Sequence, residues 1–170
     1  MTAMFASAVR DWNLGHLFMR PWFWSAFFSW MVAQTIKMVI AAVKTRKFDF
    51  EYLVSTGGMP SAHSALVLGL ATSIGLTEGF GSPVTMLAIG FSAITTFDAA
   101  TVRHAAGEQA KVLNQMVREI RERNFQFQAR HLKELLGHTR KEVLWGMATG
   151  VCVAVAVCGM WPSFQAAGCF

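Results

Sequence analysis

Residues suited to acid–base or nucleophilic chemistry gather in two short stretches of the chain. The first, GGMPSAHSALVLGL, sets His63 between Ser61 and Ser64 at the start of an apolar segment. Histidine titrates near neutral pH, and the N-terminus of a helix is a ready binding site for phosphate. Pro60 suits a first helical position, so a loop and an N-capped helix would also explain the stretch. The alternative is a phosphate site with a proton donor beside it.

The second stretch is GHTRKEV, in which Glu142 follows His138 by four residues. On a helix this spacing puts both side chains on one face. The carboxylate could then accept an imidazole N–H and fix the tautomer of the ring. Gly137 and Thr139 are typical turn and cap residues, so a surface helix cap is the competing interpretation.

Two ionisable residues lie inside apolar segments. A carboxylate such as Asp98 is costly there without a partner, and Lys37 is its natural partner. This pair is either a structural ion pair or part of an active site. Arg103, at the end of an apolar segment, is either an interfacial anchor or a phosphate ligand.

Two histidines, several cations and no acidic cluster suit phosphoryl transfer without a metal or other cofactor. One imidazole can attack phosphorus while the other protonates the leaving oxygen. Lys37, Lys44, Arg46 and Arg103 are candidates to hold the phosphate oxygens as charge develops.

The elements that must position these residues are membrane helices. Of the 170 residues, 54% are hydrophobic and 15% are charged, whereas soluble domains carry about 25% charged residues. The mean hydropathy is +0.38. We expect a single domain over residues 1–170, an all-α integral membrane bundle. Its spanning segments are predicted at 21–43, 60–76, 83–102 and 143–161, near the length of about 20 residues that a span needs.

The polar stretch 104–141 has apolar residues at helical spacing. It predicts an amphipathic helix at the membrane surface or packed on the bundle. Of the 15 lysines and arginines, 12 lie in 44–47 or 103–141. Counting crossings puts both blocks on one face, which the positive-inside rule makes cytoplasmic. No basic run is interleaved with aromatic residues, which argues against nucleic-acid binding. Glycine-rich faces on the spans favour association into a homo-oligomer.

The motifs resemble a known superfamily. PSAHS is similar to the second motif of the type 2 phosphatidic acid phosphatases, relatives of bacterial acid phosphatases and vanadium-dependent haloperoxidases. GHTRKEV is similar to their third motif, with Glu142 in place of an aspartate. The stretches AQTIK, GGMPSAHSALV, FDAATVRHAAGEQAKVLN and LKELLGHTRKEV resemble the divergent, YuiD-like bacterial branch and are spread over residues 33–146.

The resemblance implies roles for individual residues. His138 would be the nucleophile that forms a phosphohistidine, Glu142 would orient it, His63 would be the general acid and Ser61 a phosphate ligand. The first motif of the superfamily, a lysine followed seven residues later by Arg-Pro, has no match in spacing here. The third-motif arginine position holds Leu132, for which Lys133 or Arg103 could substitute.

Two functions follow as hypotheses. The first is a metal-independent membrane phosphatase acting on a lipid or isoprenoid phosphate from the cytoplasmic leaflet. The second is a non-enzymatic membrane protein that binds anionic lipid headgroups or a partner through the same basic face.

Overall fold

The computed structural model describes residues 15–46, 58–122 and 137–166. Within these ranges the secondary structure is helical, with no strand. The helices are α2 (Gly15–Phe18), α3 (Pro21–Thr45), α4 (Ala62–Glu78), α5 (Pro83–Ala100), α6 (Val102–Glu122) and α7 (Arg140–Ala166). The predicted all-α membrane bundle is confirmed.

Proline and serine fix the starts of three helices. Pro21 and Pro83 each occupy the first helical position, where a missing N–H costs nothing. Helix α4 differs from the expectation, because it starts at Ala62 and Ser61 is its N-cap. Pro60 therefore precedes the helix, and the predicted start was two residues early.

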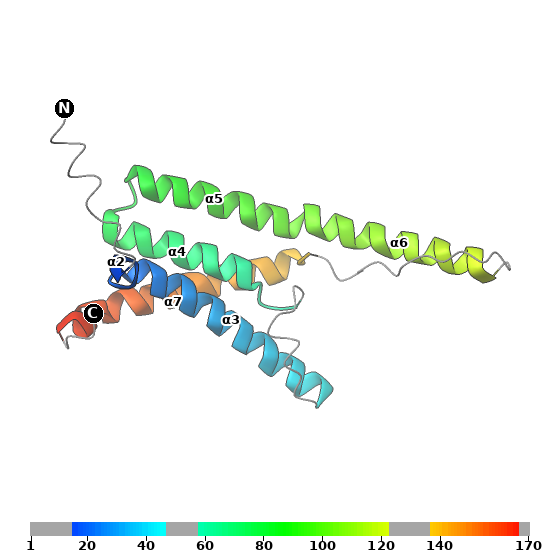
Figure 1. Cartoon of the computed structure of the whole chain (residues 1–170), viewed down its shortest axis with the longest axis horizontal. Helices are drawn as coiled ribbons and strands as arrows, with labels where there is room; N and C mark the ends of the chain where they lie inside the picture. The colour runs from blue at the N-terminus through cyan, green and yellow to red at the C-terminus, as the bar shows by residue number, and fades with distance from the viewer. Residues whose placement is uncertain (1–14, 47–57, 123–136, 167–170) are drawn as a thin grey trace.

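Helix α4 is the centre of the bundle and packs against α3, α5 and α7 (Figure 1). Small residues allow this close approach. A Cβ atom added to Gly69 would lie 2.2 Å from the Ser29 Oγ atom of α3, and one added to Gly150 of α7 would lie 2.3 Å from the Ala65 carbonyl oxygen. Small residues let helix backbones come together where lipid supplies no hydrophobic drive.

Three helices in the described ranges are long and apolar enough to cross a membrane. They are Pro21–Thr45, the α5–α6 unit Pro83–Ile120, and Arg140–Pro162. Helix α4, the fourth predicted span, has 17 residues and is about 25 Å long at 1.5 Å per residue. It lies alongside the longer helices and is covered by them (Figure 1).

Successive long helices alternate in direction. Figure 1 shows that α3 ends, α4 begins, α5 ends and α7 begins at the same end of the bundle. These helix directions are the ones predicted from the sequence. It brings the two chemistry-bearing stretches to one end.

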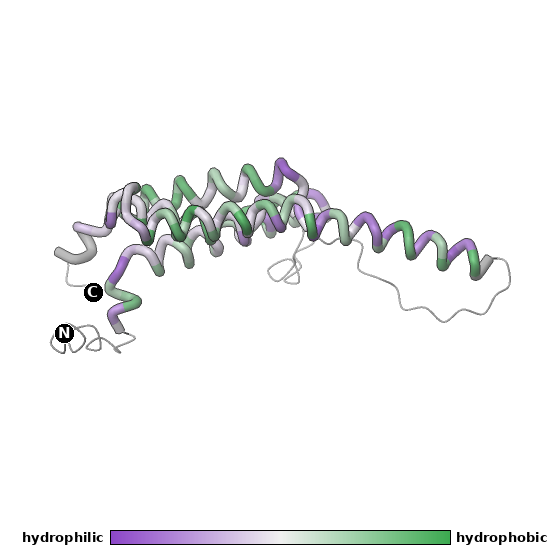
Figure 2. Tube along the Cα trace, turned by 90° about the horizontal axis from the view of Figure 1, so that it is seen from above, coloured by the Kyte–Doolittle hydropathy of each residue, from purple (hydrophilic) through white to green (hydrophobic). Residues whose placement is uncertain are grey.

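Helix α6 lies in the predicted amphipathic stretch, and of its two expected positions the one packed on the bundle is not observed. It follows α5 after a single residue, Thr101, and continues past the end of the bundle (Figure 1). Among the described helices it contacts α5 and no other, so it is not packed on the bundle. Figure 2 shows hydrophilic and hydrophobic residues alternating along it, as expected for an amphipathic helix.

Candidate functional site

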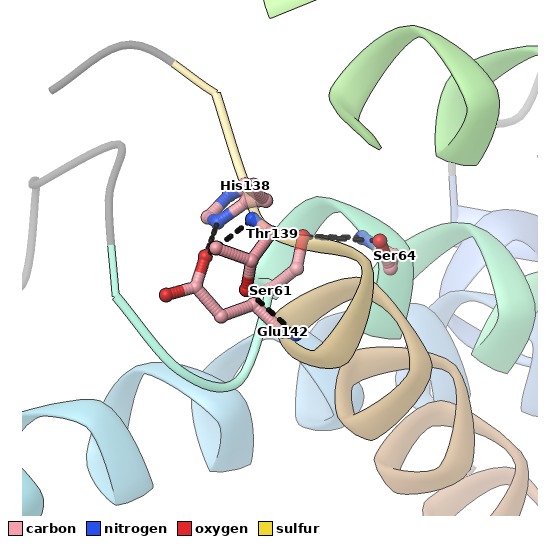
Figure 3. A network of polar contacts seen from close by, with 5 residues as sticks. All are labelled: Ser61, Ser64, His138, Thr139 and Glu142. Atoms are coloured by element: carbon pink, nitrogen blue, oxygen red, sulfur yellow. Dashed lines mark hydrogen bonds and ion pairs between the residues drawn. The ribbon is translucent and has the colours of Figure 1, made fainter. Parts of the chain in front are cut away.

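The N-terminus of α4 is organised by two serines (Figure 3). The Ser61 Oγ atom accepts hydrogen bonds from the Ser64 backbone N–H at 3.4 Å and from the Ser64 hydroxyl at 3.0 Å. Both residues are fully buried. A hydroxyl has one donor and two acceptor positions, so neither contact uses the Ser61 hydroxyl proton. Ser61 is the helix cap and keeps a donor for a further acceptor.

The N-terminus of α7 is closed by a capping box (Figure 3). The Thr139 N–H donates to the Glu142 Oε2 atom at 2.9 Å, and the Glu142 N–H donates to the Thr139 Oγ1 atom at 3.3 Å. This reciprocal pair satisfies two backbone donors of the first turn. The sequence signal of this box is the Thr-x-x-Glu spacing, in which Glu142 is the partner of the cap residue Thr139.

The same carboxylate oxygen holds His138. The His138 Nδ1 atom lies 3.3 Å from Glu142 Oε2. An ionised carboxylate only accepts hydrogen bonds, so Nδ1 carries the proton and Nε2 presents a lone pair. The arrangement is the one expected for an oriented imidazole nucleophile.

The two histidines predicted to act together are close in space. Their ring centroids are 6.5 Å apart and their planes are inclined at 55°. His138 is 3% exposed, whereas His63 is open to its surroundings. The helix starts that carry them are joined by a hydrogen bond of 3.0 Å from the Ser61 N–H to the Glu142 carbonyl oxygen.

Burial sets the protonation of the inner histidine. Desolvation lowers the pKa of His138 below its ordinary value of 6.5, and the nearby charges of Lys37 and His63 act in the same direction. The charge and hydrogen bond of Glu142 oppose this effect. His138 is therefore neutral, and able to act as a nucleophile, at neutral pH.

Lys37 lies at this site, with 4% of its surface exposed. Its Cγ and Cδ atoms pass 3.5 and 3.6 Å from where a Cβ of Gly58 would be. Gly58 has φ +92°. Because it has no side chain, the aliphatic part of Lys37 can lie beside the residues that precede α4. The Lys37 charge acts on His63 and His138, and the Glu142 charge acts on Lys37.

Asp98 has a different partner from the expected one. Its Oδ2 atom accepts from the Arg103 Nε atom at 2.7 Å, across the junction of α5 and α6. The prediction that Lys37 pairs with Asp98 was wrong, because Asp98 lies close to Arg103, five residues later in the chain, where α5 passes into α6. Both side chains are partly exposed, at 56% for Arg103 and 38% for Asp98. The Arg103 charge also acts on His63.

Lys44 and Arg46 are placed less centrally. Both are exposed at the C-terminal end of α3, where Figure 1 shows that helix diverging from α4 and α7. Arg46 closes α3 in a left-handed conformation, with its N–H donating to the Ala42 carbonyl oxygen at 2.8 Å. Lys133, the substitute considered for the third-motif arginine, lies outside the described residues.

Comparison with known proteins agrees with this architecture. Residues 18–153 match the family described as the "Divergent PAP2 family". The chain is 42% identical over 135 residues to "Uncharacterized membrane protein YuiD" of Bacillus subtilis (strain 168), with 74% of this chain and 85% of that protein covered. No solved structure matches the chain. The extent of the family match, together with this relative, shows that the chain belongs to the Divergent PAP2 family.

Proposed function

We propose that this protein is a membrane phosphatase that hydrolyses a lipid or isoprenoid phosphate through a phosphohistidine, without a metal. The observation that carries the proposal is the pair of imidazoles 6.5 Å apart, one buried and held by a carboxylate, the other open. Both rings lie within reach of a single tetrahedral phosphoryl group.

The first half-reaction follows from the tautomer of His138. Its Nε2 lone pair attacks phosphorus, and the P–O bond to the lipid alcohol breaks. His63, protonated, gives its proton to the leaving oxygen, so the alcohol departs neutral. Glu142 stabilises the positive charge that develops on the His138 ring.

The second half-reaction reverses these roles. His63, now neutral, removes a proton from a water molecule as that water attacks phosphorus. The P–N bond breaks, and His138 recovers its lone pair while inorganic phosphate leaves. Each residue returns to its starting protonation state.

Cations and donors around the rings suit the phosphate oxygens. Lys37 and Arg103 act electrostatically on His63, and Ser61 retains a hydroxyl donor. Preorganised charges of this kind stabilise the negative charge that develops in the transition state. Arg103 would have to leave Asp98, or share itself between Asp98 and the phosphate, to take this role.

The place of the site favours an amphiphilic substrate. The histidines lie at the starts of α4 and α7, and these two helices start at the same end of the bundle (Figure 1). This is the depth at which a headgroup phosphate would meet them. The basic residues at that end favour the cytoplasmic face.

The direct test is phosphate release by the purified protein. Wild-type protein in detergent, with EDTA present, is expected to release phosphate from a phosphatidate or an isoprenoid phosphate. His138→Ala is expected to abolish turnover and the acid-labile phosphoenzyme trapped with ³²P-labelled substrate. His16→Ala, in α2 at the far end of the bundle, is the matched control. Full turnover by His138→Ala would exclude the mechanism.

The alternative of a non-enzymatic lipid-binding protein draws on Lys44 and Arg46, which are exposed where α3 diverges from the bundle. It predicts no hydrolysis by wild-type protein. It also predicts that binding to anionic vesicles survives in a His63→Ala, His138→Ala double variant and weakens in Lys44→Gln, Arg46→Gln.

A further inference from the structure

We infer that Gly137 is a positioning residue. Because it has no side chain, the backbone at Gly137 packs directly against the junction between α5 and α6, and this contact fixes the position of His138 relative to His63. The catalytic consequence rests on the proposed role of His138 as nucleophile. The positioning itself is a property of the fold and can be measured separately.

Gly137 fits against backbone, with no room for a side chain. A Cβ atom there would lie 2.3 Å from the His104 nitrogen, 2.4 Å from the Arg103 carbonyl carbon and 2.7 Å from the His104 Cα atom. These are main-chain atoms at the start of α6 and cannot rotate away as a flexible side chain would. Gly137 also has φ +87°, a conformation that glycine adopts without steric cost.

The next residue is bound to the same junction. The His138 N–H donates to the Ala99 carbonyl oxygen at 3.0 Å. Ala99 is in the last turn of α5, where carbonyl groups lack partners within the helix. The interruption of the helix at Thr101, with φ −120° and ψ −68°, marks this turn as the end of α5.

His138 is therefore held by two helices at once. Helix α5 fixes its backbone through Ala99, and the first turn of α7 fixes its ring through Glu142. The distance between the His138 and His63 rings depends on both contacts. A side chain at position 137 would lift the chain from the junction, break the bond to Ala99 and move the ring.

Gly79 provides a matched control. It also has φ +87°, and a Cβ atom there would have nothing within 4 Å. Both glycines have a φ in the region that other residues rarely adopt, but only Gly137→Ala places an atom against the junction. We expect kcat for Gly137→Ala to fall at least about a hundredfold below that of Gly79→Ala, since a displacement of 1 Å can cost about that much. Lys37, on α3, does not depend on this contact, so we expect the larger part of the loss in kcat rather than in KM.

A second readout does not require activity. In protein labelled with ¹³C at histidine Cε1, the His138 signal, assigned with His138→Gln, reports the pKa of that ring. Wild-type protein and Gly79→Ala are expected to show a pKa below the ordinary histidine value. In Gly137→Ala the pKa should move towards the ordinary value, because the ring leaves its buried place.

A third measurement needs no variant. The His138 backbone N–H of the wild-type protein should exchange slowly with solvent, since it is bonded to Ala99. Fast exchange of this amide would overturn the inference whether or not Gly137→Ala folds. The same holds if Gly137→Ala and Gly79→Ala show equal kcat and equal His138 titration. If wild-type protein hydrolyses no lipid phosphate, the proposed function fails, while the titration and exchange results still decide the role of Gly137.

Discussion

A single oxygen of Glu142 serves two purposes. Its Oε2 atom accepts from the Thr139 N–H at 2.9 Å and contacts the His138 Nδ1 atom at 3.3 Å. The first contact stabilises the start of α7, and the second orients the imidazole. Because a glutamine can close a capping box but carries no charge, the two purposes can be separated by mutation.

Glu142→Gln is expected to lower kcat by about a hundredfold or more while leaving the thermal midpoint nearly unchanged, because the cap survives and the charge facing the imidazolium is lost. Thr139→Ala should do the reverse. Loss of its side-chain cap should destabilise the protein by about 1 kcal/mol, with a smaller effect on kcat. Turnover and thermal unfolding in the same detergent measure both quantities. Equal turnover by Glu142→Gln and wild-type protein would contradict the orienting role.

The dependence of activity on pH follows from the buried state of His138. Attack on phosphorus needs the neutral imidazole, and burial lowers the pKa of this ring from the ordinary 6.5. Protonation, and with it loss of the nucleophile, should thus occur only below pH 6.5. The acid limb of kcat/KM, which reports the free enzyme, should have its midpoint below that value. An acid limb centred at or above pH 6.5 would argue against His138 as the nucleophile.

At the scale of helices, α4 and α7 approach closely through glycine. A Cβ atom on Gly146 would lie 2.3 Å from the Ser61 carbonyl oxygen, and one on Gly150 would lie 2.3 Å from the Ala65 carbonyl oxygen. The Gly-x-x-x-Gly pattern of α7, which in sequence favours association between chains, is used inside the chain. Association into a homo-oligomer stays a prediction. Gly146 and Gly150 do not support it, because they pack against α4 of the same chain.

Gly150→Ala is expected to destabilise the protein by about 1–3 kcal/mol, because an atom is forced into a packed helix interface. Gly159→Ala is the control on the same helix, since a Cβ there meets nothing within 4 Å. It should leave stability unchanged or raise it by up to about 1 kcal/mol through better helix propensity. Thermal unfolding of both variants in detergent gives the comparison. Similar midpoints for the two would show that the α4–α7 contact is looser than described.

At the scale of the whole molecule, the alternation of the helices places Lys44 and Arg103 at one end and the α4–α5 turn at the other (Figure 1). This arrangement gathers the ends of α3 and α5 with the starts of α4 and α7. The α5–α6 unit, 38 residues from Pro83 to Ile120, is about 57 Å long at 1.5 Å per residue. Because the hydrocarbon core is about 30 Å thick, part of this unit must extend beyond it.

Single cysteines test this topology. In a background without the three native cysteines, Lys44→Cys and Arg103→Cys should react with an impermeant maleimide from the same side of sealed vesicles. Gly81→Cys, in the α4–α5 turn, should react from the other side. If the site faces the cytoplasm, the first two should be protected in right-side-out vesicles and reactive in inverted ones. Labelling of Lys44→Cys and Arg103→Cys from opposite sides would refute the shared end.

Much of the architecture could be predicted because its causes are local. Runs of apolar residues mark the membrane helices, and Pro21 and Pro83 mark their first turns. The four-residue spacing of His138 and Glu142 predicts their contact, which is observed although His138 precedes the first residue of α7. Counting crossings then predicts that both histidines share one end, and their rings are 6.5 Å apart.

The contacts between helices could not be obtained in this way. Three contacts depend on how each helix is rotated and where it is interrupted. They are the ion pair of Asp98 with Arg103, the approach of Lys37 to the histidines, and the packing of Gly137 against the α5–α6 junction. Hydropathy and spacing along the chain determine which residues form helices and which ends meet. Packing of backbone against backbone, which involves residues distant in sequence, decides which side chains face the site, so only the tertiary structure could reveal it.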